Sequence, residues 1–350
     1  MTRIKPRRIY YYDDNEEKGN KKKIKYLLFL LLITGLLLTT STYAWFTTNR
    51  IATVEMINVK VQTEGSLEIS VDGIDWKPGV TEQEIKNARS TYPTSVNQLP
   101  SYIEPTSTIG SLSNNGFMDM YLGLIKSNSN GDYIIDSSKS VETEGNGDNS
   151  EGKFIAFDIF LRISDTKPIY LTDESEVIYN GTSTGTENAI RIAFIIEGNT
   201  PSTSSAAVIQ SLSTTNNNNV YIWEPNYNTH TNNGIANARD IYNLTVTANN
   251  PTRLNYDGIK AEFNESENVT LKNANITRFP NYFGTVTPRI QTIKGNETYQ
   301  PLWTLNAGVT KVRVYMWLEG QDVDCENNAS AGDLSFRMQF STNPSKNAQN

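Results

Sequence analysis

KFIAFDIFLRISD, residues 153–165, decides the fold expected for this chain of 350 residues. Every second residue is large and apolar, so one face of an extended segment carries five such side chains. These five residues are Ile155, Phe157, Ile159, Leu161 and Ile163. A period of two is typical of a β-strand, whereas an amphipathic helix repeats its apolar positions every 3.6 residues. The segment therefore predicts a strand with one face in a hydrophobic core.

The same alternation recurs along the rest of the chain. Residues 188–197 place Ile190, Ile192, Phe194 and Ile196 on one face and Arg191 on the other. Residues 311–319 and 335–341 alternate in the same way, and 219–223 and 242–247 are shorter β runs. No long amphipathic helix competes with these strands, so we expect an all-β antiparallel sandwich. Alternation also predicts that most strands have one wet face.

The first part of this β region has two local features. Val59 and Val61 precede Glu64-Gly65, and Leu67, Ile69 and Val71 follow it with the same period. Such a pattern on both sides of a turn predicts a hairpin. Residues 81–88 are expected to form a short helix, and the loop-rich stretch around 201–280 is expected to be an insertion on one face of the sandwich.

The N-terminal region has the layout of an export signal. Within KKKIKYLLFLLLITGLLLTTSTYAWFTTNR, residues 21–50, four lysines precede an apolar run from 27 to 38. Small and hydroxyl residues follow, and then Tyr43-Ala-Trp-Phe46. This order of basic, apolar and small residues is typical of a signal peptide cleaved at Ala44–Trp45. We therefore expect the remainder to be exported.

A retained membrane anchor is the alternative to cleavage. Residues 26–46 provide about the 20 residues that a helix needs to span a bilayer, with aromatic residues at the outer interface. In both interpretations residues 1–25 are a basic cytoplasmic region, because positive charge stays inside. Residues 26–46 are then the signal or the anchor, and 47–350 form the extracellular β domain. The protein is expected at the cell surface, secreted or membrane-anchored.

Charge and residue counts exclude several kinds of function. The net charge is −7, and the first 44 residues carry nine Lys and Arg against four Asp and Glu, which leaves −12 for the remainder. An acidic exported part argues against nucleic acid as a partner. One cysteine, Cys325, excludes an intrachain disulfide, and one histidine, His230, excludes a zinc site built on a His pair.

Residues 42–71 resemble a known family. Thr42-Tyr-Ala-Trp-Phe46, a β run to Val61 and Gly65-Ser-Leu-Glu-Ile-Ser-Val71 look like the start of the TasA/camelysin-type surface proteins of Gram-positive bacteria. The resemblance implies a dedicated signal peptidase, a jelly-roll-like sandwich and fibre subunits that donate an N-terminal strand to the next copy. The C-terminal segment 314–325 is similar to uncharacterised exported Firmicutes proteins. No matching catalytic motif supports the peptidase activity attributed to camelysin-type members.

Two stretches contain candidate binding residues. Asp322, Asp324 and Glu326 alternate in an acidic loop and offer the oxygen ligands that calcium prefers, although a solvated turn is the simpler explanation. Trp223 and Tyr227, with Trp317, offer rings for stacking on a sugar, although Trp223 also suits the core at a strand end. Apart from calcium, no cofactor is expected.

These observations favour a structural function over catalysis. No G-x-S-x-G, Cys/His pair or phosphate loop is present, so we expect no enzyme. The leading hypothesis is an exported surface structural or adhesive protein that self-assembles or binds a cell-wall or matrix polymer. Residues 45–61 are the candidate exchanged strand, with pairing inside their own domain and a stalk as alternatives. A carbohydrate-binding module and, third, a hydrolase are the other hypotheses.

Overall fold

The computed structural model divides the chain into two units, residues 1–43 and 44–350. It describes residues 23–30, 52–62, 66–127, 133–142, 152–181, 184–240, 244, 254, 256–270, 273–286, 289–290, 301–325 and 333–343. In the first unit, residues 23–30 are helical and their apolar side chains are exposed, from 52% at Leu30 to 70% at Tyr26. Within the described ranges, no helix combines the length and apolar character needed to cross a membrane.

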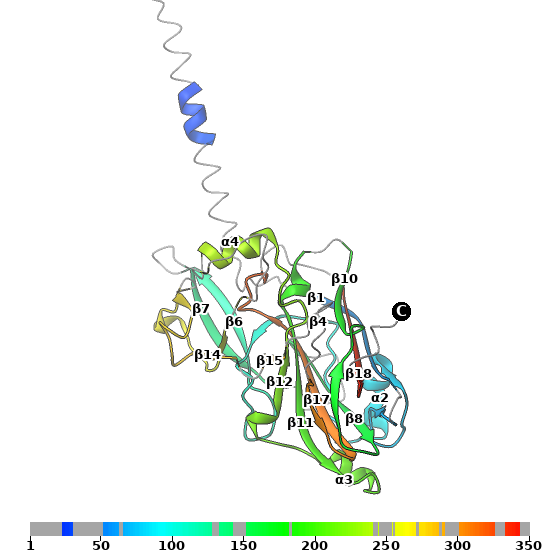
Figure 1. The fold of residues 1–350 in the computed structure, drawn as a ribbon. Helices are drawn as coiled ribbons and strands as arrows, with labels where there is room; N and C mark the ends of the chain where they lie inside the picture. The colour runs from blue at the N-terminus through cyan, green and yellow to red at the C-terminus, as the bar shows by residue number, and fades with distance from the viewer. Residues whose placement is uncertain are drawn as a thin grey trace, which may run out of the picture. The chain divides into compact units, whose positions relative to one another are not determined.

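The second unit is mostly β, with two large sheets (Figure 1). In the described residues, sheet A has the order β16-β9-β18-β1-β3, with β10 beside β18 and β4 beside β1. Its strands are β1 (Ala52–Val61), β3 (Gly79–Thr81), β4 (Tyr102–Ile103), β9 (Lys167–Leu171), β10 (Glu176–Asn180), β16 (Trp303–Leu305) and β18 (Asp333–Ser341).

Sheet B has the order β15-β12-β11-β17-β5-β6-β7 in the described residues, and β8 joins β17 to β2. Its strands are β2 (Glu68–Ser70), β5 (Pro105–Ser107), β6 (Met120–Ser127), β7 (Tyr133–Ser140), β8 (Ile155–Ile163), β11 (Ile190–Thr200), β12 (Val220–Trp223), β15 (Arg289–Ile290) and β17 (Gly308–Glu319). A separate ribbon pairs β13 (Asp257–Ile259) with β14 (Phe283–Thr285).

The helices among the described residues of this unit are short. They are α2 (Glu82–Asn87), α3 (Ala206–Gln210), α4 (Asn232–Asp240), and the 3-10 turns η1 (Ala88–Ser90), η2 (Thr186–Ala189), η3 (Asn217–Asn219) and η4 (Glu265–Glu267). The helix expected at 81–88 is confirmed as α2. Thr81 accepts a hydrogen bond from the Glu84 N–H, while the Glu84 carboxylate accepts one from the Thr81 N–H. This reciprocal pair fixes the start of the helix.

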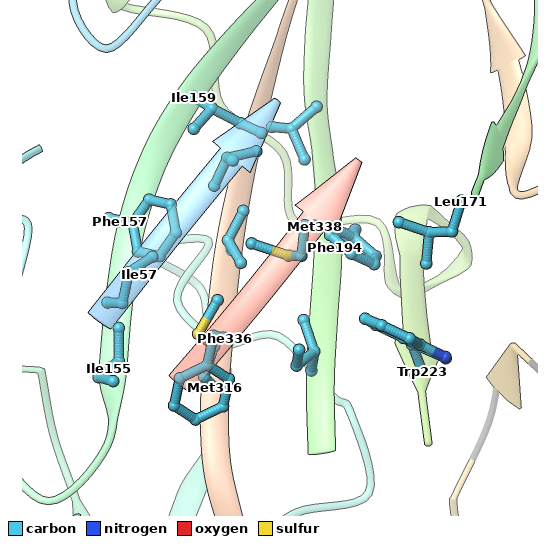
Figure 2. Packing of buried hydrophobic residues seen from close by; sticks show 14 of the residues in the cluster. Ile57, Ile155, Phe157, Ile159, Leu171, Phe194, Trp223, Met316, Phe336 and Met338 are labelled. Carbon is cyan, nitrogen blue, oxygen red and sulfur yellow. The ribbon is translucent and has the colours of Figure 1, made fainter. Parts of the chain in front are cut away.

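The main core lies between the two sheets, as Figure 2 shows. Ile57 on β1 and Phe336 and Met338 on β18 come from sheet A. They meet side chains of β8, β11, β12 and β17 from sheet B, including the alternating residues of the 153–165 segment. The predicted strands therefore form, and their apolar faces are the ones that the period of two predicts.

The expected hairpin around Glu64-Gly65 does not form. β1 pairs with β18, β3 and β4 in sheet A, whereas β2 pairs with β8 in sheet B. The chain thus passes from one sheet to the other after Val61. Both strands face the shared core, so a change of sheet gives the same alternation as a hairpin. The purely antiparallel expectation is also wrong at three pairs, because β1–β18, β12–β15 and β5–β17 are parallel.

The expectation of one wet face fails in the middle of sheet B. All twelve residues of β17 are buried, and in β8 only Arg162 is partly exposed. Other parts of the chain cover the second face of this sheet, among them the segment around α3, which lies beside the lower ends of β11 and β17 in Figure 1. The β run expected at 242–247 lies outside the described residues apart from Leu244.

Candidate functional site

β1 occupies a slot inside sheet A. Its core-facing residues Ile57, Val59 and Val61 stand in register with Phe336, Met338 and Phe340 of β18. On its other side β1 pairs with β3 and, nearer its start, with β4. Fully burying a Val or Ile side chain contributes about 1.5–3 kcal/mol, so the slot holds this strand firmly.

No tight turn connects β1 to any of its sheet partners. β18 is the last of the described strands, and β3 begins 18 residues after β1 ends. A strand in a two-residue hairpin is tied to its neighbour, but β1 is tied to β18 only through the rest of the domain. Another copy of the same ten residues would satisfy the slot with the same register and contacts.

A polar groove of about 330 Å³ lies beside this slot, on the outer face of sheet A. It is lined by Asn58, Lys60, Glu174, Glu176, Arg337, Met338 and Gln339. Arg337 Nη1 donates to Glu176 Oε1 at 3.2 Å, and Gln339 Nε2 donates to Glu174 Oε2 at 2.9 Å. The groove thus presents both cationic groups (Lys60, Arg337) and anionic groups (Glu174, Glu176) to solvent.

The covered face of sheet B contains charged side chains in two clusters. In the first, the Arg313 guanidinium donates to Glu142 and, at 2.7 Å, to Asp158 Oδ1. The Tyr315 hydroxyl also donates to Glu142. Lys311 Nζ lies 2.6 Å from Glu197 Oε2 and 3.5 Å from Asp158 Oδ2. Each of these ionised groups is at most 8% exposed, so all depend on one another for charge compensation.

The second cluster surrounds Arg191 on β11. Its guanidinium donates to Glu224 at 2.5 Å and to Asp322, and these three side chains are at most 6% exposed. Nearby, Glu319 accepts from the Trp317 indole N–H at 3.0 Å and from the Gln321 N–H at 2.9 Å. This cluster fixes the turn that follows β17.

Burial shifts the pKa of several of these carboxyls. It raises the pKa of Glu197 to about 7, and the charge of Asp158 adds to the effect. Burial also raises the pKa of Glu319 to about 7 and that of Asp322 to about 6, in the latter case against the attraction of Arg191. For Asp158 burial acts upward, but the charges of Arg313 and Lys311 prevail and lower its pKa.

The predicted calcium ligands have protein partners. Asp322 pairs with Arg191, as described above. Asp324 Oδ2 lies 2.7 Å from His230 Nδ1, and its Oδ1 accepts from the Thr231 N–H and hydroxyl at 2.7 and 2.9 Å. Glu326 lies outside the described residues. Among the described residues, no group of three or more His, Cys, Asp or Glu is arranged to hold a metal.

Asp324 and its partners instead hold the start of α4. The Thr231 hydroxyl accepts from the Gly234 N–H at 2.8 Å, as an N-cap residue does. A Cβ on Gly234 would lie 2.2 Å from Asp324 Oδ1, so only glycine permits this close approach. The Asp324 carboxylate therefore joins the loop that follows β17 to the start of α4.

The predicted sugar-binding residues are placed differently from each other. The Trp223 ring is 1% exposed and belongs to the main core, and Trp317 is fully buried. Neither ring has an exposed face on which a sugar could stack, because both are packed between other side chains. Tyr227 is half-buried in the turn after β12. The predicted cleavage residues Ala44 and Trp45 lie outside the described residues.

Sequence reasoning missed the charged clusters of sheet B. Asp158, Lys311 and Arg313 stand at polar positions of strands whose other face is apolar, which is also the pattern of a strand with a wet face. One signal was available: Ala156, Phe160, Tyr315 and Trp317 on the same faces are apolar or aromatic. Charges among such residues indicate a covered face.

Comparisons of the chain with protein-family models, with curated proteins and with solved structures found no match.

Proposed function

We propose that the protein is an exported structural subunit of the cell surface that assembles with other copies through strand β1. The N-terminal segment 45–51 and β1 of one copy would enter sheet A of the next. No second function has an observation that favours it, because the tryptophans expected to bind sugar are buried.

The observation that carries the proposal is the position of β1. It fills an internal slot of sheet A, parallel to β18, without a hairpin to hold it in its own chain. Exchange between copies keeps the same buried residues and the same register, so little free energy separates the closed monomer from the exchanged assembly. Concentration then favours assembly.

One further feature supports export. The helix at 23–30 exposes Ile24 and four residues from Leu27 to Leu30 by 52–64%, which suits an apolar environment. We propose that this helix belongs to a signal or an anchor. We also propose that the two sheets form a jelly-roll-like sandwich, with a matrix or cell-wall polymer bound by the polar groove of sheet A.

A peptide added in trans tests the assembly. Cells that express the full chain should release or display assemblies that sediment on ultracentrifugation. A synthetic peptide of residues 45–61 should occupy the slot and lower the sedimenting fraction at least five-fold when added in excess during assembly. The N-terminal residue of the recovered protein separates release from anchoring: Trp45 indicates cleavage, and Met1 or Thr2 indicates an anchor.

A matched peptide provides the control. The same peptide with Ile57→Asp and Val59→Asp keeps its length but places charges against Phe336 and Met338, so it should leave assembly unchanged. Inhibition by both peptides alike, or by neither, would count against β1 as the assembly element.

A further inference from the structure

Three charged side chains from adjacent strands meet on the covered face of sheet B. Lys311 lies on β17, and the two strands that flank it carry Asp158 on β8 and Glu197 on β11. Lys311 Nζ lies 3.5 Å from Asp158 Oδ2 and 2.6 Å from Glu197 Oε2. Lys311 Nζ also donates to the carbonyl oxygens of Gln210 and Leu212, at 3.2 and 3.0 Å. An amine thus lies beside two carboxyl groups.

The surroundings exclude water from this group. Tyr92, Phe160, Ile209 and Val309 form an apolar cluster at the site, and the Tyr92 ring centre is 5.7 Å from Lys311 Nζ. The side chains of the amine and its two acids are 1–8% exposed. A buried ion pair carries a large desolvation cost, which disappears if the two charges combine into a neutral amide. The same burial restricts the access of water, the reactant that would hydrolyse such a bond.

We propose that Lys311 and Asp158 become joined by an intramolecular amide bond, with Glu197 as the group that transfers the proton. The Lys311 ammonium gives one proton to the Glu197 carboxylate, and the freed Nζ attacks Asp158 Cγ. The new N–Cγ bond forms, and the Cγ–Oδ2 bond breaks. Oδ2 leaves as water with two protons, one from Glu197 and one directly from the nitrogen. One positive and one negative charge disappear, and Glu197 is regenerated.

The contacts of Asp158 suit this reaction. Arg313 Nη1 lies 2.7 Å from Oδ1, where negative charge develops as the nitrogen attacks, and a fixed cation at that position stabilises the intermediate. The Tyr92 hydroxyl donates to Oδ2, the leaving oxygen, at 2.9 Å. Asn97 accepts a hydrogen bond from the Asp158 N–H at 3.0 Å and so fixes the strand at this residue.

The unfavourable step is the transfer of a proton from the Lys311 ammonium to Glu197. The neighbouring acids raise the pKa of Lys311 against the effect of burial, and Arg313 with Lys311 lowers that of Asp158, so the pair begins as ions. Glu197, whose pKa burial raises to about 7, exists in both protonation states near neutral pH. It can therefore both accept and return the proton, as an acid–base catalyst must.

Peptide mapping of the full chain recovered from expressing cells tests the bond directly. After digestion with trypsin, we expect no cleavage at Lys311 and a branched peptide that contains Lys311 and Asp158, 18 Da lighter than its two parts. Lys77 and Glu84 are the matched control in the same molecule, because their ion pair is 2.5 Å long but exposed to water. They should give ordinary, unlinked peptides.

Variants assign the roles of the residues. Lys311→Arg should abolish the linked peptide, and Glu197→Gln should lower its yield at least ten-fold while preserving the shape of the side chain. Full linkage in Glu197→Gln would overturn the role of Glu197. Wild-type protein with complete cleavage after Lys311, or with an 18 Da loss at another position, would overturn the bond itself. That result does not depend on the folding of a variant, nor on whether the protein assembles.

Discussion

Sheets A and B share one core, but Arg337 on the outer face of sheet A is exposed whereas Arg313 on the outer face of sheet B is buried. On β18 of sheet A, the outward residue Arg337 is exposed and its ion pair with Glu176 lies in solvent. On β17 of sheet B, the outward residue Arg313 is 1% exposed and its two carboxylate partners are equally buried. The same alternation of apolar and charged residues thus produces a wet face in one sheet and a second interior in the other.

This difference in burial affects how firmly the outer face of each sheet is held. Removing a buried charge partner leaves another charge unpaired in a medium that cannot solvate it, so the outer face of sheet B locks the covering segments in place. Among the described residues, no buried charge cluster covers the outer face of β1 and β18 in sheet A, and β1 is not held by a hairpin. We infer that sheet B is the permanent frame and that sheet A receives the exchanged strand.

The largest expected effect comes from removing the charge of Arg313. Arg313→Met leaves the buried Glu142 carboxylate without its cation, whether or not Asp158 is linked to Lys311, so the free energy of unfolding should fall by about 3–5 kcal/mol. Urea denaturation measures this loss. The matched change Arg337→Met on sheet A removes an exposed pair and should cost at most about 1 kcal/mol. Equal losses in the two variants would erase the contrast between the faces.

Glu319 should make the stability of the frame depend on pH. Burial raises its pKa in the folded chain to about 7, above its ordinary value of 4.5, so between these values the folded chain keeps a proton that the unfolded chain releases. The contribution is complete below pH 4.5 and is lost as pH rises through about 7, with an upper bound of about 3 kcal/mol. Denaturation of wild type and Glu319→Gln at several pH values measures it, and the variant should show a shallower fall.

Glu84 on α2 provides the contrast to Glu319. A hydrogen bond from Lys77 lowers the pKa of this partly exposed carboxyl, so its contribution is present above its ordinary pKa and is lost as pH falls. Glu84→Gln should therefore change only the acid side of the curve. Identical pH profiles for wild type and Glu319→Gln would show that the buried carboxyl does not titrate in this window.

A smaller effect is expected where α4 meets the frame. Gly234→Ala places a methyl group 2.2 Å from Asp324 Oδ1, a short side chain already held by His230 and Thr231. Such overpacking typically costs about 1–3 kcal/mol. Thermal unfolding measures the loss, and the exposed neighbour Asn233→Ala should change stability by about 0.5 kcal/mol or less. A Gly234→Ala protein as stable as Asn233→Ala would mean that the loop and α4 are not tightly joined.

The smallest effect is expected at the start of α2. Thr81→Ala removes the side chain that caps this helix and should cost about 1 kcal/mol, whereas Thr81→Ser keeps the hydroxyl and most of the stability. Urea denaturation of the three proteins gives the order wild type, Ser, Ala. Equal stability of the Ala and Ser variants would assign the position of α2 to its buried residue Ile85 rather than to its cap.

The sequence predicted strands better than it predicted their neighbours. The period of two in 153–165 and 311–319 depends only on each strand and its core, so β8 and β17 were found with their inward faces correct. Pairing depends on distant residues: β1 and β2 alternate as a hairpin would, yet they belong to different sheets. Trp223 shows the same limit, because an aromatic ring at a strand end suits a core and a binding surface equally.

Local sequence patterns could not predict the charged clusters, for a related reason. From the sequence alone, Lys311 and Arg313 are predicted to face solvent. The segments that cover them come from residues around 96, 142 and 210. Asp322 and Asp324 were predicted as possible calcium ligands in an acidic loop, but their partners Arg191 and His230 lie about 130 and 90 residues earlier in the sequence. Spacing within one loop cannot reveal such pairs.

A cysteine pair across β1 and β18 tests the exchange most directly. Asn58 and Arg337 are register partners whose side chains line the same outer groove, so Asn58→Cys with Arg337→Cys, in a Cys325→Ser background, reports which copy supplies β1. The protein is oxidised after assembly and separated on a non-reducing gel. Strand exchange predicts a ladder of covalently linked copies. Assembled material that runs as monomers, each with its own internal disulfide, would contradict the account.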